Sequence, residues 1–313
     1  MKAKLMCAVI SFFLLVLPCF SKAAEAQKND PFMNNETTKN MPDMDLLKDS
    51  ETIEVKKPFS NQSFEFNLMY HYFDYKEDFP PPGKSTEKGW VPGIYAGWNY
   101  NKKNDVYTKI FLEYSFGNTT YDGTTQTGTP ITFSDHNNQS FFRFEWDIGY
   151  NIAISKSISL KPYVGYGYRN WSRGEVNTTA TYSSYNEVYY WHYFPVGIMA
   201  DLTIGDKLVI QPNAGIRFMF NGKMTANLSE LDPGYNDPHF KLGNKPGWYA
   251  EIPVTYKFSQ TWAIVMKPWY EYSEIGQSDT VPLTYYGTVI GSAYEPSSKT
   301  KQYGVNVGVV ASY

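Results

Sequence analysis

Apolar and polar residues alternate with a period of two over most of the chain. Early in the pattern, Phe64, Phe66 and Leu68 alternate with Glu65 and Asn67. This alternation places successive side chains on opposite faces of a β-strand. Ten segments show it, most of them longer than the usual globular strand of about 5–6 residues and long enough to cross a bilayer at a tilt. The segments are 62–75, 90–101, 105–117, 139–152, 158–171, 188–203, 207–221, 247–258, 262–275 and 301–313.

The connections between these segments alternate in length. The short ones are 101–104, 153–157, 204–206 and 259–261, and the long polar ones are 76–89, 118–138, 172–187, 222–246 and 276–300. Short turns on one side and long loops on the other are typical of outer-membrane barrels. A sheet in hydrocarbon must close, because every backbone polar group needs a partner. The sequence therefore predicts an all-β, closed antiparallel transmembrane barrel with periplasmic turns, extracellular loops and both termini in the periplasm.

The strand count depends on one segment in the fifth long connection. Residues Thr284 to Tyr294 contain a further alternating stretch. If it forms a hairpin above the membrane, the barrel has ten strands; if it crosses the bilayer, the barrel has twelve and a wider lumen. Pro162, Pro212 and Pro268 fall on outward positions, and each lacks a ladder donor, so we expect bulges or strand ends there.

The N-terminal residues differ from the rest. Residues 1–24 carry Lys2 and Lys4 before an apolar core and small residues, which predicts a cleaved signal peptide. Residues 25–60 are polar and nearly free of aromatics, which predicts a flexible periplasmic lead-in to a barrel over 61–313. Both cysteines, Cys7 and Cys19, lie in the signal, so disulfides are excluded from the mature chain.

Composition narrows the class of protein further. Aromatic residues make up 18% of the chain, although the mean hydropathy is only −0.44. Alternating strands explain both values, whereas helical membrane spans need long apolar runs. The net charge of −3 offers no basic surface for nucleic acid. We expect a location in the bacterial outer membrane, with lipid and lipopolysaccharide as partners. The last strand ends on an aromatic residue, Tyr313, which resembles the signal read by the barrel-assembly machinery.

Charged residues at inward positions balance, with seven of each sign. The basic members are Lys109, Arg143, Lys161, Arg169, Arg217, Lys257 and Lys267, and the acidic members are Glu65, Glu113, Glu145, Asp147, Asp201, Glu251 and Glu271. A ten-stranded barrel is narrow, and unpaired buried charges cost several kcal/mol each. We therefore expect these residues to pair across the lumen and plug it. The alternative is a constricted pore for small solutes.

Tyrosines also occur in the predicted long loops, apart from those expected at the membrane interfaces. These residues, which could contact an external ligand or form an ordinary loop core, are Tyr121, Tyr182, Tyr185, Tyr235, Tyr285, Tyr286 and Tyr294.

Catalytic and metal-binding motifs are sparse. The four histidines form no pattern typical of a zinc site, and neither a metal nor a cofactor is indicated. The fourth long loop does contain Asp237-Pro238-His239. Together with the ten-strand plan, this resembles the omptin family of outer-membrane proteases, in which an Asp-x-His pair activates water with a second acidic pair. The resemblance implies a peptidase using Asp237 and His239, but the second loop offers only Asp122 and Asp135, thirteen residues apart.

Overall fold

The structure is a computed structural model that describes residues 61–81, 83–124, 130–174 and 185–313, with the backbone alone for 131–137. The predicted signal peptide (1–24), the lead-in (25–60) and Tyr182 lie outside the described residues. Among the residues that are described, no helix combines the length and the apolar character that crossing a bilayer requires.

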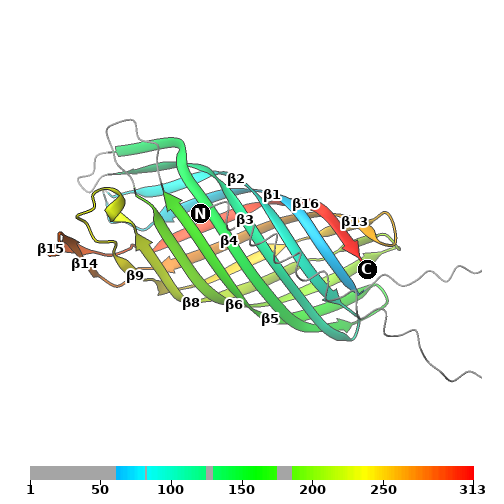
Figure 1. Ribbon diagram of the computed structural model, residues 1–313. Helices are drawn as coiled ribbons and strands as arrows, with labels where there is room; N and C mark the ends of the chain where they lie inside the picture. Colours follow the sequence, from blue (N-terminus) through cyan, green and yellow to red (C-terminus); the bar gives the residue numbers. More distant parts are fainter. Residues whose placement is uncertain (1–60, 82, 125–129, 175–184) are drawn as a thin grey trace, which may run out of the picture. The chain divides into compact units, whose positions relative to one another are not determined.

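Ten wall positions, two of them occupied by interrupted strands, form one antiparallel sheet that closes on itself (Figure 1). The ring is closed by β1 and β16, which pair from Ser63 opposite Ser312 to Glu77 opposite Ser298. The prediction of a closed barrel of ten strands is therefore confirmed. In chain order the wall consists of β1 (Gln62–Glu77), β2 (Ser85–Asn101), β3 (Asp105–Thr124), β4 (Pro130–Ala153), β5 (Ile158–Gly174), β6 (Glu187–Ile204), β7 (Leu208–Ile210) with β8 (Asn213–Ala226), β11 (Pro246–Glu251) with β12 (Val254–Lys257), β13 (Trp262–Gly276) and β16 (Ser298–Ser312).

Proline interrupts the two broken strands. Pro212 separates β7 from β8, as expected, and Pro253 separates β11 from β12 at the neighbouring wall position. The two interruptions lie side by side, because the backbone amide of Gln211 donates a hydrogen bond to the backbone carbonyl of Pro253 at 2.8 Å. The expectations for Pro162 and Pro268 were wrong: β5 and β13 run unbroken through them, and the strand beside Pro268 carries the break instead.

The outer face of the wall is apolar between two limits. At one end, charged outward residues Asp74, Lys88 and Lys301 follow directly on Tyr72, Trp90 and Tyr303. We call this the loop end, and the opposite end, which holds the short turns, Gln62 and Ser312, the turn end. The apolar band between them is the membrane-spanning part, and residues beyond Tyr72, Trp90 and Tyr303 toward the loop end lie outside it.

Several strands continue past the band at the loop end. β3 and β4 pair as far as Thr124 opposite Pro130, across residues that the polar sequence predicted as loop. Tyr121 was wrongly assigned to a loop; it lies on β3. Alternation of apolar and polar residues stops there because both faces of the sheet meet polar surroundings, whereas the backbone ladder continues.

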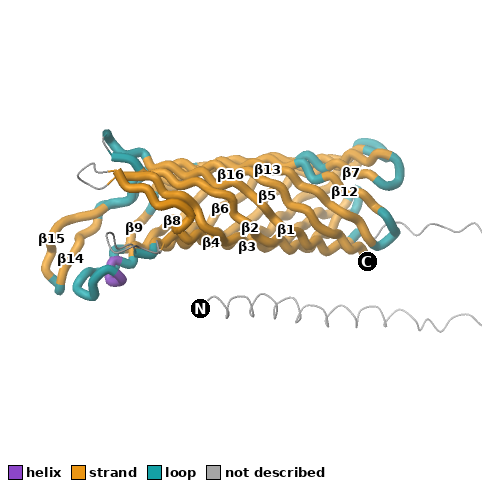
Figure 2. Tube along the Cα trace, turned by 90° about the horizontal axis from the view of Figure 1, so that it is seen from above, coloured by secondary structure: helices purple, strands orange, loops and turns teal. Residues whose placement is uncertain are grey.

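Small elements cover the loop end. They are a 3-10 helix (Leu228–Glu230), β9 (His239–Lys241), β10 (Gly243–Asn244) and the hairpin of β14 (Val281–Tyr285) and β15 (Thr288–Ala293). The hairpin forms its own two-stranded sheet and does not join the wall, which decides the count at ten rather than twelve. Figures 1 and 2 both place it at the end of the barrel opposite to the C-terminus.

An aromatic core fills the lumen near the loop end. The Trp171 ring centroid lies 4.6 Å from that of Tyr189, 5.6 Å from that of Phe73 and 5.9 Å from that of Phe141. All four side chains are buried. We call this group the aromatic layer; it separates two clusters of charged residues.

Candidate functional site

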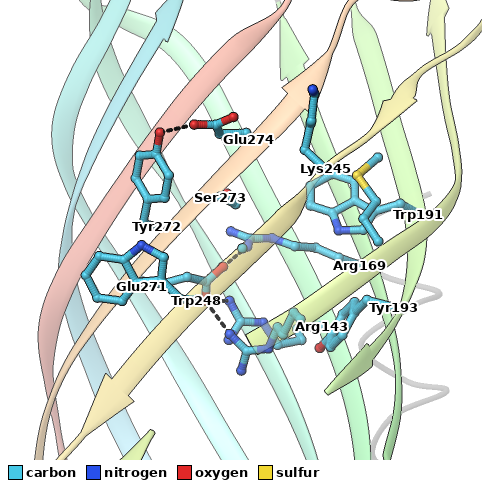
Figure 3. Close-up of a pocket in the computed structure, with 13 residues that line it drawn as sticks. Arg143, Arg169, Trp191, Tyr193, Lys245, Trp248, Glu271, Tyr272, Ser273 and Glu274 are labelled. Atoms are coloured by element: carbon cyan, nitrogen blue, oxygen red, sulfur yellow. Dashed lines mark hydrogen bonds and ion pairs between the residues drawn. The ribbon is translucent and has the colours of Figure 1, made fainter. Parts of the chain in front are cut away.

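The first charged cluster centres on Glu271, in the middle of the lumen (Figure 3). Its carboxylate forms ion pairs with Arg143 at 2.5 Å, with Arg217 at 2.9 Å and with Arg169. β4, which carries Arg143, lies directly across the lumen from β13, which carries Glu271, because four wall positions separate the two strands on either side. These ion pairs therefore span the diameter of the barrel.

Two further glutamates complete this central network. Arg143 also pairs with Glu113 at 3.2 Å, and Arg217 pairs with Glu145 at 3.0 Å. Six charged side chains from β3, β4, β5, β8 and β13 thus join in one set of contacts. Three guanidinium groups meet three carboxylates, so the buried charges balance, which is the condition for such a network to persist in a low-dielectric lumen.

The remaining predicted lumen charges lie toward the turn end. Three of the basic side chains there have acidic partners: Lys267 pairs with Glu65 at 2.9 Å, Lys161 with Asp201 at 2.6 Å and Lys109 with Glu251 at 3.6 Å.

Asp147 has no ion pair within 4.0 Å among the described residues. Asp147 is nonetheless buried, and among the basic side chains Lys109 has the strongest electrostatic interaction with it. Lys257 is half-buried and faces Asp201. The fourteen residues chosen from the sequence are therefore mostly joined in pairs, in two groups at different depths.

The open space in the lumen is uneven. Cavities of only about 20 Å³ and about 30 Å³ border the central network on its two sides, each with room for about one or two water molecules. Toward the turn end there is a vestibule of about 560 Å³, lined by residues of the turns and by the lysine pairs.

A second charged cluster lies outside the membrane band, beyond the aromatic layer. Arg173 on β5 pairs with Glu77 at 3.0 Å, with Glu187 at 2.8 Å and with Glu87. Glu295, before β16, is buried beside them. We call these five residues the outer cluster. This cluster was not predicted from the sequence, because its residues fall in predicted loops. The one available signal was the inward series Arg169, Trp171 and Arg173, which continues past the end of the predicted strand.

The outer cluster contains four acidic side chains but one basic side chain. Burial raises the pKa of Glu87 to about 7, against the opposing effect of Arg173, and the charges of Glu187 and Glu77 add to the rise. Burial, and then the charges of Glu77 and Glu187, hold the pKa of Glu295 well above its usual range. Four carboxyl groups around one guanidinium thus favour retained protons on Glu87 and Glu295.

His71 on β1 was not selected from the sequence, and it lies in the lumen between Phe141 and Trp269. It is buried, and neither ring nitrogen has a hydrogen-bond partner among the described residues. A buried unpaired polar group costs about 1–3 kcal/mol.

The two candidate catalytic residues have separate partners. Asp237 accepts hydrogen bonds from the Ser229 amide at 2.8 Å and from its hydroxyl at 2.9 Å. His239 is exposed on β9, and its Nδ1 lies 2.8 Å from the Thr225 hydroxyl. Asp122 pairs with Lys84, which directly precedes the neighbouring strand β2. Within the described residues, the structure thus joins none of these groups to each other.

The tyrosines divide between the interior and the surface. Tyr121 and Tyr185 lie close to Arg173. Tyr235 and Tyr285 pack against each other at 4.9 Å between centroids. Tyr286, in the turn of the hairpin, and Tyr294, directly after β15, are exposed. Among the described residues, no group of three or more histidine, cysteine, aspartate or glutamate side chains is arranged to hold a metal ion.

A closed ten-stranded wall with an apolar band and a charged lumen defines a transmembrane β-barrel of the bacterial outer membrane. The chain matches, over residues 68–267, the family model described as the autotransporter β-domain. Because this match covers more than half of the chain, the protein belongs to that family.

Among solved structures, the chain is similar to the outer-membrane protease OmpT of Escherichia coli, with 9% identity, a TM-score of 0.56 and coverage of 82% of this chain and 98% of that one. It also matches the transport unit of the autotransporter AIDA-I of Escherichia coli at 9% identity, a TM-score of 0.40 and 82% and 91% coverage. It matches the translocator domain of the autotransporter NalP from Neisseria meningitidis at 8% identity and a TM-score of 0.37, with coverage of 78% of this chain and 88% of that one. A comparison with curated proteins finds no match. The likeness to OmpT shows the fold alone.

Proposed function

We propose that this protein is an outer-membrane barrel whose lumen is closed to solutes and which acts at the cell surface through the segments of its loop end. In this proposal the turn end faces the periplasm and the loop end faces outward, as short turns and long connections do in bacterial barrels.

The observation that carries the proposal is the salt bridge between Arg143 and Glu271, made across the full diameter of the lumen. Arg169 and Arg217 reach the same carboxylate from two more strands. To pass, a solute would have to separate buried ion pairs, and removing one partner of such a pair costs about 3–5 kcal/mol. The aromatic layer supports the proposal independently, because it fills the lumen at the next level with apolar rings.

The test is conductance in planar lipid bilayers with the purified full chain. We expect no reproducible unit steps from the wild type, and we expect steps from the variant Arg143→Ala, Arg169→Ala, Phe141→Ala and Trp171→Ala, which truncates side chains of both the central network and the aromatic layer. The matched control is Lys84→Ala with Lys88→Ala, which removes two basic side chains at the loop end. Stable unit steps from the wild type would overturn the closed-lumen proposal.

Two alternatives have weaker support. A narrow channel for small solutes is favoured only by the vestibule of about 560 Å³, which stops at the central network. The family name suggests transport, and passage of a polypeptide would meet the same ion pairs. An omptin-like peptidase needs Asp237 to orient His239, whereas each has another partner. Cleavage of a dibasic peptide in the presence of lipopolysaccharide, lost in His239→Ala, would favour the peptidase.

A further inference from the structure

The hairpin of β14 and β15 exposes apolar side chains at its tip and along β15. Tyr286 is 76% exposed, Val289 65% and Ile290 54%. At the base, Val281 and Ala293 pack against the aromatic layer and its neighbours. The hairpin is thus seated on the barrel core at one end and presents apolar surface at the other.

The tip is rigid. Tyr286 and Gly287 both have positive φ angles, of 44° and 79°, which is the backbone of a tight turn whose twist matches that of the strands. The Tyr286 amide donates to the Gly234 carbonyl at 2.7 Å, and the Thr284 amide donates to Asn236 Oδ1 at 2.7 Å. Little conformational freedom remains to be lost when the tip binds, which favours affinity.

The hairpin is exposed on both of its faces, because every residue from Thr288 to Ser292 on β15 is exposed. Ile290 is the extra residue of a β-bulge opposite Leu283 and Thr284. Residues 280–294 contain no Asp, Glu, Lys or Arg, although Asp279 and Glu295 flank them. A folded protein partner covers one face and usually adds charged contacts at its rim. The apolar part of a lipid bilayer, in contrast, contacts both faces of an inserted segment and disfavours charged side chains in it.

From these observations we propose that the hairpin tip inserts into the interfacial zone of a lipid bilayer facing the loop end. Tyrosine beside uncharged aliphatic residues is also the composition of the barrel's own lipid-facing band, as at Tyr70, Leu68 and Val305. Insertion is shallow, because within the described residues the outer edge of β15 pairs with no strand and its backbone groups need water. This inference rests on the proposed surface function and names its partner.

The test is flotation of nanodiscs holding the full chain with added phosphatidylcholine vesicles, at low and high salt. We expect the wild type to float at both, because no charge takes part. The double variant Val289→Ser with Ile290→Ser should bind about a hundredfold more weakly, since each of the two buried side chains contributes about a factor of ten. The matched control is Phe79→Ser, another exposed apolar residue at the loop end, which should float like the wild type.

Failure to float, equal flotation of the double variant, or loss of flotation at high salt would overturn the inference. Flotation only with cell-derived membranes, abolished by protease treatment of those membranes, would indicate a protein partner instead. Self-association of nanodiscs without vesicles, in place of flotation, would indicate a second copy. Conductance of the same preparation reports separately on the proposed function: a silent barrel that does not float refutes only the insertion, and a conducting barrel that floats refutes only the closed lumen.

Discussion

Glu87 offers a quantitative test of the outer cluster. Its side chain is fully buried; its Oε2 accepts a hydrogen bond from Gln139 at 2.6 Å, and Oε1 accepts one from Arg173. A rise in its pKa from 4.5 to about 7, at about 1.4 kcal/mol per pH unit, corresponds to about 3 kcal/mol of folding free energy. The folded state holds this proton more tightly than the unfolded chain does. The contribution is therefore complete below pH 4.5 and is lost as the pH rises toward 7.

The measurement is urea unfolding from phospholipid vesicles, followed by tryptophan fluorescence between pH 4.5 and 8. The Glu87→Gln variant keeps the shape of the side chain and removes the proton. The difference in free energy of unfolding, wild type minus variant, should fall by about 3 kcal/mol across this range, and other titrating groups cancel in the difference. Asp78→Asn, at an exposed pair with Lys299, is the control and should show no such fall. A flat difference for Glu87→Gln would mean that Arg173 holds an ionised carboxylate throughout, and the reasoning would be wrong.

Three further predictions concern the membrane-spanning part. Glu271→Gln leaves three arginines without their shared partner and should cost about 3–5 kcal/mol in urea unfolding; a loss below about 1 kcal/mol would show that the central network is not held together by this carboxylate. His71→Leu replaces an unpaired buried ring with an apolar side chain of similar size and should raise the free energy of unfolding by about 1 kcal/mol, whereas a decrease would reveal a polar partner for the ring. Ile148→Arg puts a charge on the lipid face, where Ile148 is 46% exposed, and should cost about 2–4 kcal/mol; unchanged assembly into vesicles, measured by protection from protease, would contradict the assigned facing.

The wall could be predicted from the sequence because burial in lipid imposes a strict period on the outward residues. Phe142, Phe144 and Trp146 alternate with Arg143 and Glu145, and the structure places the two sets on opposite faces as expected. The same argument fails at Asn118 and Asp122, where the ladder continues but the outward side chains face water in place of lipid. The predicted strands therefore ended too early. Arg173, which lies past the predicted end of its strand, was for this reason not recognised as an inward residue.

The charged lumen was only partly predictable. Alternation gives the face of Glu271 and the sign of its charge, but which arginines reach it depends on the stagger between strands around the closed sheet. That stagger follows from long-range pairing, such as Glu271 opposite Gln302, which no local pattern encodes. The separate partners of Asp237 and His239 show the converse. Proximity in sequence did not produce contact, because Asp237 is held by Ser229, whereas His239 begins β9 and lies beside Thr225.

The order of layers along the lumen links the two clusters. On β5 the inward side chains Arg169, Trp171 and Arg173 belong in turn to the central network, the aromatic layer and the outer cluster. Apolar rings between the clusters exclude water from both. Exclusion of water strengthens each ion pair around Glu271, where the charges balance. It has the opposite consequence around Arg173, because one guanidinium cannot balance the charge of four carboxylates, and burial favours protonation of those in excess. The raised pKa of Glu87 is thus a physical consequence of the same filling of the lumen that, in our proposal, prevents conduction.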